Sequence, residues 1–318
     1  MKVLKFGGKS LADKTKIFGI CNYVKGLTLT HKLIVVVSAI GNNTDNLLNI
    51  AKEYSAGIDN LRELDVLLST GETQSASLFS MALNSLNVRA ISLQAWQIEL
   101  KTMGKHGQSV VTGINKNRIL SELKTHDVVV ITGFQGLNNN NDITTLGRGG
   151  SDTTAVALGA VFNCEVEIFS DYDGVFTGDP KDLLFKKIKQ IDYNSMQRIA
   201  NNGAKVLSST SVDIARQANV DVWCKQSSAP NKSGTHICNV PLPSIALTCK
   251  DNLCEINLLC NSETNNLQKT AKYIINNVNY YKIFIKNNKI TLLLNSQLKT
   301  QTLTQIAKIN NLLEVDNV

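Results

Sequence analysis

Two glycine-rich turns contain the residue types that bind phosphate and carboxylate groups. The first, KFGGKS at residues 5–10, joins a short apolar run to a predicted helix, and the second, at residues 144–154, carries Arg148, Ser151 and Asp152 ahead of another predicted helix. Glycines let backbone N–H groups approach a phosphate closely, and a helix N-terminus favours negative charge. The guanidinium of Arg148 suits a carboxylate. Together the turns indicate a site for an anionic substrate.

Each turn also has a purely structural interpretation. Paired glycines at residues 7–8 are typical of a tight turn, and Ser151 or Asp152 can simply cap the helix that follows. The GKS at residues 8–10 is similar to the end of a P-loop, but that motif needs a glycine where Val3 stands. A P-loop fold is therefore disfavoured, and neither turn identifies a ligand alone.

Short apolar runs rich in β-branched residues alternate with amphipathic stretches up to about residue 240. This alternation predicts an α/β domain with a mostly parallel sheet sandwiched by helices. The predicted strands are 2–6, 33–37, 88–93, 127–132, 164–170 and 220–225, and the clearest predicted helices are 72–86 and 151–161.

Composition changes after the PLP at residues 241–243, because the rest of the chain contains no Gly, Pro or Arg. Regular apolar runs nevertheless favour a folded domain over a low-complexity tail. The predicted order is strand 254–260, helix 265–276, a hairpin of strands 280–286 and 289–295, helix 302–309 and strand 312–315. This is one βαββαβ unit, the α+β ferredoxin-like arrangement.

Seven sequence blocks in a fixed order carry a resemblance that no single block would establish. They are residues 5–8, 37–39 with 44–47, 69–72, 133–136, 144–154, 171–180 and 203–207. Through them residues 1 to about 240 resemble the aspartate kinases of the amino-acid kinase family. The resemblance implies an amino-acid kinase catalytic domain at 1–243, followed at 244–318 by a single ACT-like regulatory or dimerisation domain.

The resemblance implies ATP-dependent phosphorylation of the L-aspartate side-chain carboxylate, giving 4-phospho-L-aspartate and ADP in the first step of lysine, threonine, methionine and diaminopimelate biosynthesis. It assigns catalysis to Lys5, Asp152 and Lys205, and aspartate binding to Thr44, Glu72, Arg148 and Ser151. It assigns ATP binding to Lys5, Phe6, Gly7, Gly8, Ser170, Asp171, Phe176, Lys181, Lys205 and Val206, although Phe176 could equally be a packing residue. Mg²⁺ is expected on the ATP phosphates, without a dedicated protein metal site. The acceptor is already ionised at neutral pH, so no catalytic histidine is needed.

Three features depart from the family pattern. Lys9 stands where Thr or Ser is usual, and it can either point to solvent, which we favour, or point inward and repel Lys5 and Lys205. Ser208-Ser209-Thr210 replaces a usual His-Pro-Arg. The tail has room for one ACT-like module rather than two, so we expect weakened or absent feedback by lysine or threonine.

Other functions remain open at this point. A kinase for acetylglutamate, glutamate or UMP would share the phosphate-binding apparatus, and a non-catalytic amino-acid sensor could keep the fold. Retention of Lys5, Glu72, Arg148, Asp152 and Lys205 together argues against the sensor.

Net charge and amino-acid composition argue against several other classes of protein. The net charge of +7 is scattered and aromatic residues make up only 6% of the chain, which disfavours a nucleic-acid partner. No run reaches membrane-spanning length, and the N-terminus lacks a signal-peptide apolar region, so neither a membrane nor a secreted location is expected. The seven cysteines form no CxxC pair, which argues against a disulfide framework. We expect a cytoplasmic protein that forms a homodimer or higher homo-oligomer.

Overall fold

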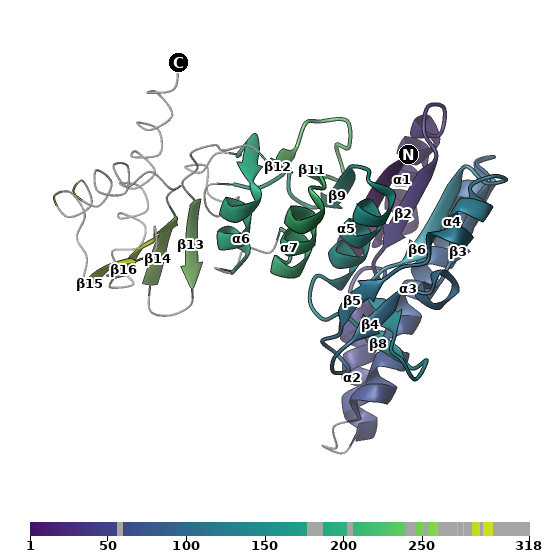
Figure 1. Cartoon of the computed structure of the whole chain (residues 1–318). Coiled ribbons are helices and arrows are strands. Elements are labelled where there is room, and N and C mark those ends of the chain that lie inside the picture. The colour runs from purple at the N-terminus through teal and green to yellow at the C-terminus, as the bar shows by residue number, and fades with distance from the viewer. Residues whose placement is uncertain are drawn as a thin grey trace.

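The fold is built on an eight-stranded sheet with β1 (Lys2–Phe6) near its centre (Figure 1). The computed structural model describes residues 1–55, 60–176, 187–201 and 206–239, and beyond them 246–250, 254–259, 272, 276, 282–286 and 289–294. The strand order is β10-β12-β11-β9-β1-β2-β6-β3, and every neighbouring pair is parallel except β11 and β12. The other strands of this sheet are β2 (Leu33–Val37), β3 (Ala90–Leu93), β6 (Val128–Thr132), β9 (Val166–Ser170), β10 (Gln190–Asp192), β11 (Val222–Gln226) and β12 (Thr235–Cys238).

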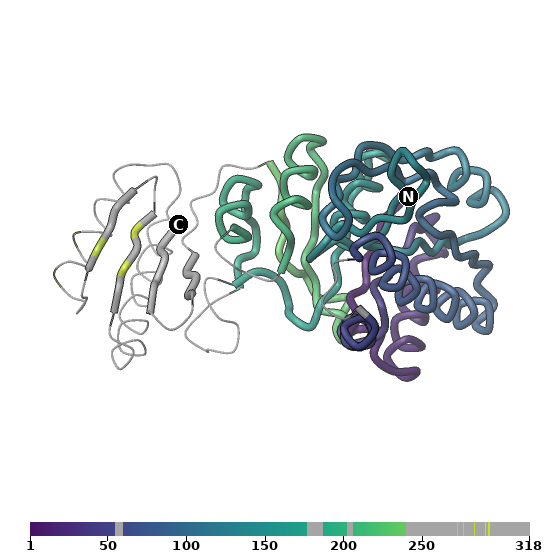
Figure 2. Tube along the Cα trace, turned by 90° about the horizontal axis from the view of Figure 1, so that it is seen from below, coloured from purple at the N-terminus to yellow at the C-terminus, as the bar shows by residue number. Residues whose placement is uncertain are grey.

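Helices cover both faces of this sheet, which is why β2 and β6 are buried along their whole length. They are α1 (Lys14–Leu27), α3 (Leu61–Ser85), α4 (Lys116–Glu122), α5 (Gly150–Phe162), α6 (Tyr193–Asn201) and α7 (Ser209–Ala218), with 3₁₀ turns η1 (Gly8–Leu11) and η2 (Ala95–Ile98). Helix α2 (Asn43–Ser55) packs against α3 instead. In Figure 2 the purple α1 and the green α7 lie on opposite sides of the sheet. The described helices are each too short or too polar to cross a membrane.

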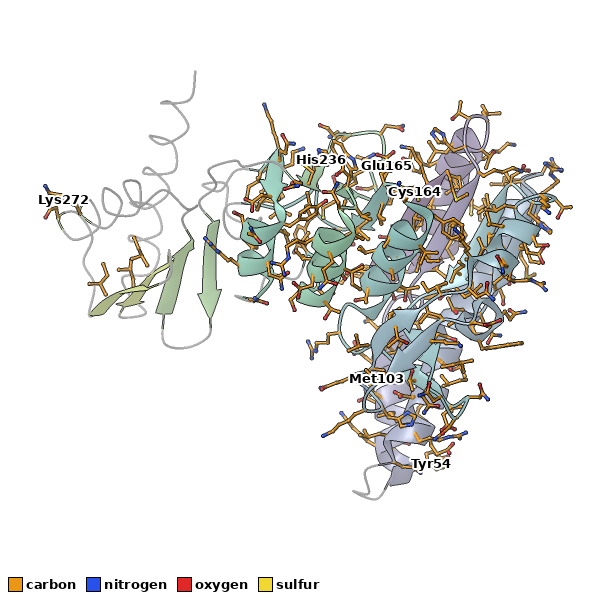
Figure 3. The ribbon with its side chains drawn as sticks, viewed as in Figure 1. Tyr54, Met103, Cys164, Glu165, His236 and Lys272 are labelled. Atoms are coloured by element: carbon orange, nitrogen blue, oxygen red, sulfur yellow. The ribbon has the colours of Figure 1, made fainter. Side chains whose placement is uncertain are left out.

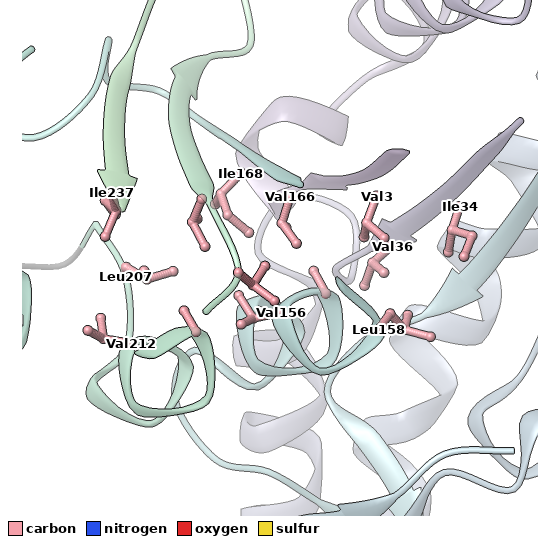
Figure 4. Packing of buried hydrophobic residues seen from close by; sticks show 14 of the residues in the cluster. Val3, Ile34, Val36, Val156, Leu158, Val166, Ile168, Leu207, Val212 and Ile237 are labelled. Atoms are coloured by element: carbon pink, nitrogen blue, oxygen red, sulfur yellow. The ribbon is translucent and has the colours of Figure 1, made fainter. Parts of the chain in front are cut away.

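The alternation of side chains along β1 assigns Lys5 to one face. Val3 packs into the cluster that α5 and α7 cover (Figure 4), whereas Leu4 and Phe6 pack into the cluster that α1 and α3 cover. Because successive side chains of a strand point to opposite faces, Lys5 shares the face of Val3. The sequence of this strand therefore directs the lysine toward α5.

A second, four-stranded sheet was absent from the predictions. Its order is β5-β4-β7-β8, formed by β4 (Lys101–Met103), β5 (Val110–Gly113), β7 (Gln135–Leu137) and β8 (Ile143–Thr145). In Figure 3, Met103 of β4 lies at the opposite edge of the domain from Glu165, which precedes β9, so this sheet lies on the side of the carboxyl ends of the large sheet. Three- and four-residue strands with mixed polarity leave almost no periodic signal, which explains the omission.

The predicted elements of the large domain are otherwise confirmed, with differences at their ends. Strands β1 and β2 have the predicted bounds, and the remaining predicted strands are present with shifted ends. Helix α3 begins at Leu61 rather than at residue 72, because it runs through Gly71 instead of starting after it. A Cβ on Gly71 would lie 2.9 Å from the Cβ of Ala39, so this glycine allows close packing inside the helix.

After residue 239 the described strands form a separate antiparallel sheet, with α6 adjacent to β13 and β14. Its order is β13-β14-β16-β15, from β13 (Ala246–Lys250), β14 (Cys254–Leu259), β15 (Lys282–Lys286) and β16 (Lys289–Leu294). The predicted hairpin and first strand are confirmed. β13 was not predicted, and it pairs with the edge of β14 that a ferredoxin-like order would give to the last strand. Of the predicted helix at 265–276 the structure describes only residues 272 and 276, both of them helical. The predicted helix at 302–309 and strand at 312–315 lie outside the described residues.

Candidate active site

Lys5 lies at the centre of the carboxyl edge of the large sheet. It aligns with Val36 of β2 and Ile168 of β9, within two residues of the carboxyl ends of these three strands. Parallel strands bring their carboxyl ends to one edge, where open α/β sheets bind ligands. The loops after β1, β2 and β9 therefore meet around the Lys5 ammonium group.

A buried ion pair joins this lysine to the second glycine-rich turn. Lys5 Nζ lies 2.6 Å from Asp152 Oδ1, and each side chain is only 11% exposed. Asp152 stands in the first turn of α5, where the helix dipole favours a carboxylate. Among the described residues Asp152 Oδ1 has no hydrogen-bond partner beyond this ion pair. The pair fixes the ammonium group while leaving its other protons available to a ligand.

The first glycine turn is shaped by close backbone contacts. The Gly7 N–H donates to the Phe169 carbonyl at 3.3 Å, and the Gly8 carbonyl accepts from the Gly41 N–H at 2.9 Å. A Cβ on Gly8 would lie 2.5 Å from the Ala39 carbonyl oxygen, so no larger residue fits there. The Gly7 N–H is therefore used in a backbone hydrogen bond. The main contribution of this turn to the site is to hold Lys5 in place.

Phe6, predicted to contact ATP, is fully buried. Its ring stacks on Phe169 and Phe79, with ring centroids 4.7 and 6.0 Å away. Only its backbone can face a ligand.

Glu72 presents a buried carboxylate oxygen without a partner. Its Oε1 accepts the Ala39 N–H at 3.0 Å, whereas its Oε2 has no hydrogen-bond partner among the described residues. Burial raises the pKa of Glu72 to about 7, against the opposing effects of the Ala39 N–H and of the Lys5 charge. A buried carboxylate with one free oxygen is suited to a cationic group of a ligand.

This raised pKa predicts a pH-dependent stability difference between wild type and Glu72→Gln. The folded state favours the protonated carboxyl, so the contribution of Glu72 is full below its ordinary pKa of 4.5 and is lost as pH rises toward 7. Glutamine keeps an oxygen for Ala39 and never ionises. We expect the variant to gain stability relative to wild type between pH 5 and pH 8, by at most about 3 kcal/mol. Thermal unfolding midpoints measured across this range test the prediction, with the exposed Glu53→Gln as control, and parallel curves for Glu72→Gln and wild type would contradict it.

The Arg148 turn is held in an unusual backbone conformation. Gly147 and Gly149 have φ angles of 73° and 75°, in the left-handed region that glycine adopts without strain. Arg148 between them is exposed, and it forms no ion pair with a described residue. The adjacent Ser151 is buried, because Gly133 packs against it closely enough that a Cβ would lie 2.7 Å away. The turn therefore holds a free guanidinium next to the start of α5.

Thr44, the remaining predicted aspartate-binding residue, is half-buried near the start of α2. Its neighbour Asn43 donates to Gln74 Oε1 at 3.2 Å, which ties the start of α2 to α3 next to Glu72. The structure thus brings Lys5, Asp152 and Glu72 into one cluster, while Thr44 and Arg148 lie on adjoining elements.

The residues predicted to bind ATP follow β9 where they are described. The Ser170 Oγ accepts the Tyr172 N–H at 3.2 Å, and Asp171 is exposed. Phe176 is half-buried and bridges to Lys187, and Val206 packs against the hydrophobic core. Lys181 and Lys205 lie outside the described residues.

Two departures from the family pattern have local explanations. Lys9 points outward, as favoured above, with its side chain 75% exposed and its Nζ 3.3 Å from Asp171 Oδ2. Ser208 caps α7 by accepting the Ser211 N–H at 3.2 Å. Its Oγ also lies 3.3 Å from Thr153 Oγ1, which links α7 to α5.

Sequence reasoning missed two buried polar contacts that support the site. Gln135 Nε2 donates to the Ser69 carbonyl at 3.0 Å, joining two of the seven blocks. Asp65 is 1% exposed and accepts from His106, Gly107 and Thr145. The only sequence signal for Asp65 is its spacing of two helical turns from Glu72, which places both on one face of a helix.

Comparisons with known proteins agree with this geometry. A family model described as the amino acid kinase family matches residues 1–226. An aspartokinase of Geobacillus stearothermophilus is 41% identical over 238 residues, which are 74% of this chain but only 58% of that protein. An aspartokinase of Rickettsia conorii is 34% identical over 299 residues, 90% of this chain and 74% of that protein. The solved structure of E. coli aspartokinase III with aspartate and ADP has a TM-score of 0.72 at 22% identity, and covers 96% of this chain and 84% of that one.

Proposed function

Because the chain belongs to the amino acid kinase family, we propose that it transfers the γ-phosphoryl group of ATP to the side-chain carboxylate of L-aspartate. The observation that carries this proposal is the buried Lys5–Asp152 pair next to the unpartnered oxygen of Glu72. The relatives matched over most of the chain are aspartokinases. The match covers about three fifths of the Geobacillus protein. The activity proposed for this chain therefore rests on its own site residues and not on that protein as a whole.

In the proposed reaction a β-carboxylate oxygen of aspartate attacks the γ-phosphorus. The bond to the oxygen that bridges the β- and γ-phosphorus atoms breaks, and ADP leaves with the bonding electrons. Enzymes promote this transfer mainly by aligning the reactants and neutralising the phosphoryl oxygens. The Lys5 ammonium supplies positive charge at the meeting point of the loops, and Asp152 keeps it there. Mg²⁺ enters with ATP, bound mainly by phosphate oxygens and water.

Acceptor selection in this proposal depends on two opposite charges. The free oxygen of Glu72 receives the aspartate ammonium, and Arg148 receives its α-carboxylate through the planar guanidinium fork. Thr44 and Ser151 complete the acceptor side. A substrate ammonium next to Glu72 favours the ionised carboxylate, so binding offsets the effect of burial on its pKa.

The ATP-binding residues are proposed from their positions in the family pattern and from the loop that follows β9. Ser170, Asp171 and Phe176 lie at the end of β9 and in that loop, and the Gly7-Gly8 turn adjoins β9. Val206 is assigned to ATP on sequence position. Lys181 and Lys205 are assigned to ATP on sequence position alone, with Lys205 as a second phosphate-neutralising lysine.

We further propose a division into a catalytic domain at 1–243 and an ACT-like domain at 244–318. In its support, the family match ends at residue 226, and β12 at Thr235–Cys238 is the last strand of the large sheet. β13 then begins a separate sheet at Ala246. The proposal includes a cytoplasmic homo-oligomer at the start of lysine, threonine, methionine and diaminopimelate synthesis.

Acceptor specificity tests the function directly. Purified protein is incubated with ATP, Mg²⁺ and, separately, aspartate, glutamate, N-acetylglutamate or UMP, and ADP release is measured. Hydroxylamine traps an acyl phosphate as its hydroxamate. We expect turnover and hydroxamate with aspartate alone. Absence of aspartate-dependent ADP release would defeat the proposal, and turnover with another acceptor would reassign the enzyme within its family.

A further inference from the structure

We propose that Asp65 and His106 position the Arg148 turn and thereby set the affinity for aspartate. The inference rests on the proposed function, because it concerns the acceptor side of the same site. Asp65 is a buried carboxylate on α3 that the reaction itself does not use. Its position two helical turns before Glu72 places it about 10 Å along the same helix.

Asp65 is fully engaged by two loops from the second sheet. Its Oδ2 lies 2.8 Å from His106 Nδ1, and its Oδ1 accepts the Thr145 hydroxyl at 2.5 Å. The Gly107 N–H donates to both oxygens, at 3.1 and 3.0 Å. A carboxylate with 2% of its side chain exposed tolerates burial only when such partners satisfy it. Asp65 therefore joins α3 to the β4–β5 loop and to the end of β8.

These two loops meet directly at the Arg148 turn. Thr145 ends β8 three residues before Arg148, and its carbonyl accepts the Ser109 N–H at 3.0 Å. Between Thr145 and Arg148, a Cβ on Gly147 would lie 3.1 Å from the Gly107 carbonyl oxygen. The β4–β5 loop thus contacts the chain on the approach to the Arg148 turn. Because Asp65 fixes that loop through His106 and Gly107, its hydrogen bonds determine where the turn can lie.

One helix consequently controls both charges that select the acceptor. Glu72 on α3 supplies the oxygen for the ammonium group, and Asp65 on the same helix positions the turn that carries the guanidinium. The nucleotide loop after β9 is held by different contacts, such as the Ser227 N–H to the Ser170 carbonyl at 2.9 Å. Loss of the Asp65 contacts should therefore affect aspartate and leave ATP unaffected, which a purely stabilising role would not do.

The test compares KM for the two substrates in His106→Ala, Thr145→Val and Asp65→Asn. Each removes hydrogen bonds to or from the buried carboxylate, and His106 is exposed enough for its truncation to be tolerated. We expect KM for aspartate to rise about tenfold, the effect of one charge-assisted hydrogen bond, with KM for ATP within twofold of wild type. His106→Asn retains an N–H donor and should recover part of the loss. His126→Ala removes the contact of a similarly half-buried histidine with Glu122 and should match wild type.

The outcomes separate this inference from the proposed function. A wild-type protein without aspartate-dependent turnover defeats the proposed function. An active wild type whose His106→Ala and Thr145→Val variants keep the wild-type KM for aspartate overturns the positioning role. The same holds if both KM values rise together with a lower Tm, because that pattern describes general loss of structure.

Discussion

Replacement of Lys5 by methionine is expected to lower kcat by about 10²–10³-fold, the usual effect of removing one preorganised group that stabilises transition-state charge. Methionine has a similar length and lacks the ammonium group. Lys5 lies at the meeting point of the loops after β1, β2 and β9. In the proposed mechanism its charge acts on the transferred phosphoryl group rather than on aspartate. KM for aspartate should change little. Steady-state ADP release with saturating ATP measures both parameters.

The Lys5 prediction needs controls for folding and for local charge. The variant leaves Asp152 buried without its partner, which costs on the order of 3–5 kcal/mol of stability. The double variant Lys5→Met/Asp152→Asn should recover thermal stability but not kcat. Lys9→Met removes a lysine from the same turn whose side chain is 75% exposed, and an exposed pair contributes less than about 1 kcal/mol. A folded Lys5→Met with kcat within threefold of wild type would remove Lys5 from the mechanism.

The sequence predicted the centre of the large sheet well and the small sheet not at all. β2 is a continuous apolar run buried on both faces, and β1 is buried from Val3 to Phe6, so both strands stand out clearly from their polar surroundings. α3 begins eleven residues before its predicted start, because it continues through Gly71. Its missing side chain instead allows contact with Ala39, a tertiary requirement that helix propensity does not contain.

The candidate site shows the same division between local and long-range information. Lys5, Glu72 and Asp152 were predicted because each belongs to a recognisable block, and the structure brings them together. The contacts of Asp65 with His106 and Thr145 span 41 and 80 residues, and neither Asp65 nor His106 belongs to one of the seven blocks. His106 lies in the loop between β4 and β5, outside every predicted element. The small sheet that brings this loop next to α3 was not predicted.

The charge of Lys9 could be assessed only in three dimensions. A lysine next to a phosphate turn can attract or repel, and the sequence does not state its direction. The side chain points to Asp171 after β9, because η1 places residue 9 on the outer side of the turn. The departure from the family pattern is therefore compatible with the proposed activity.

The second large effect is expected at Arg148. Substitution by alanine should raise KM for aspartate roughly 100-fold, equivalent to about 2.7 kcal/mol, because a bidentate guanidinium–carboxylate contact is lost. Arg148→Lys keeps the charge without the planar fork and should fall between alanine and wild type. Since Arg148 is exposed and makes no ion pair with a described residue, neither variant should lower the Tm.

Arg118→Lys provides the matched control for the Arg148 variants. Arg118 also lies at the surface, where it pairs with Glu122 within α4, and its substitution should leave KM for aspartate unchanged. Calorimetric titration of aspartate into each variant separates binding from turnover. A wild-type affinity in Arg148→Ala would show that the α-carboxylate is bound elsewhere. In that case the positive φ angles of Gly147 and Gly149 would have to serve a purpose other than the presentation of a guanidinium.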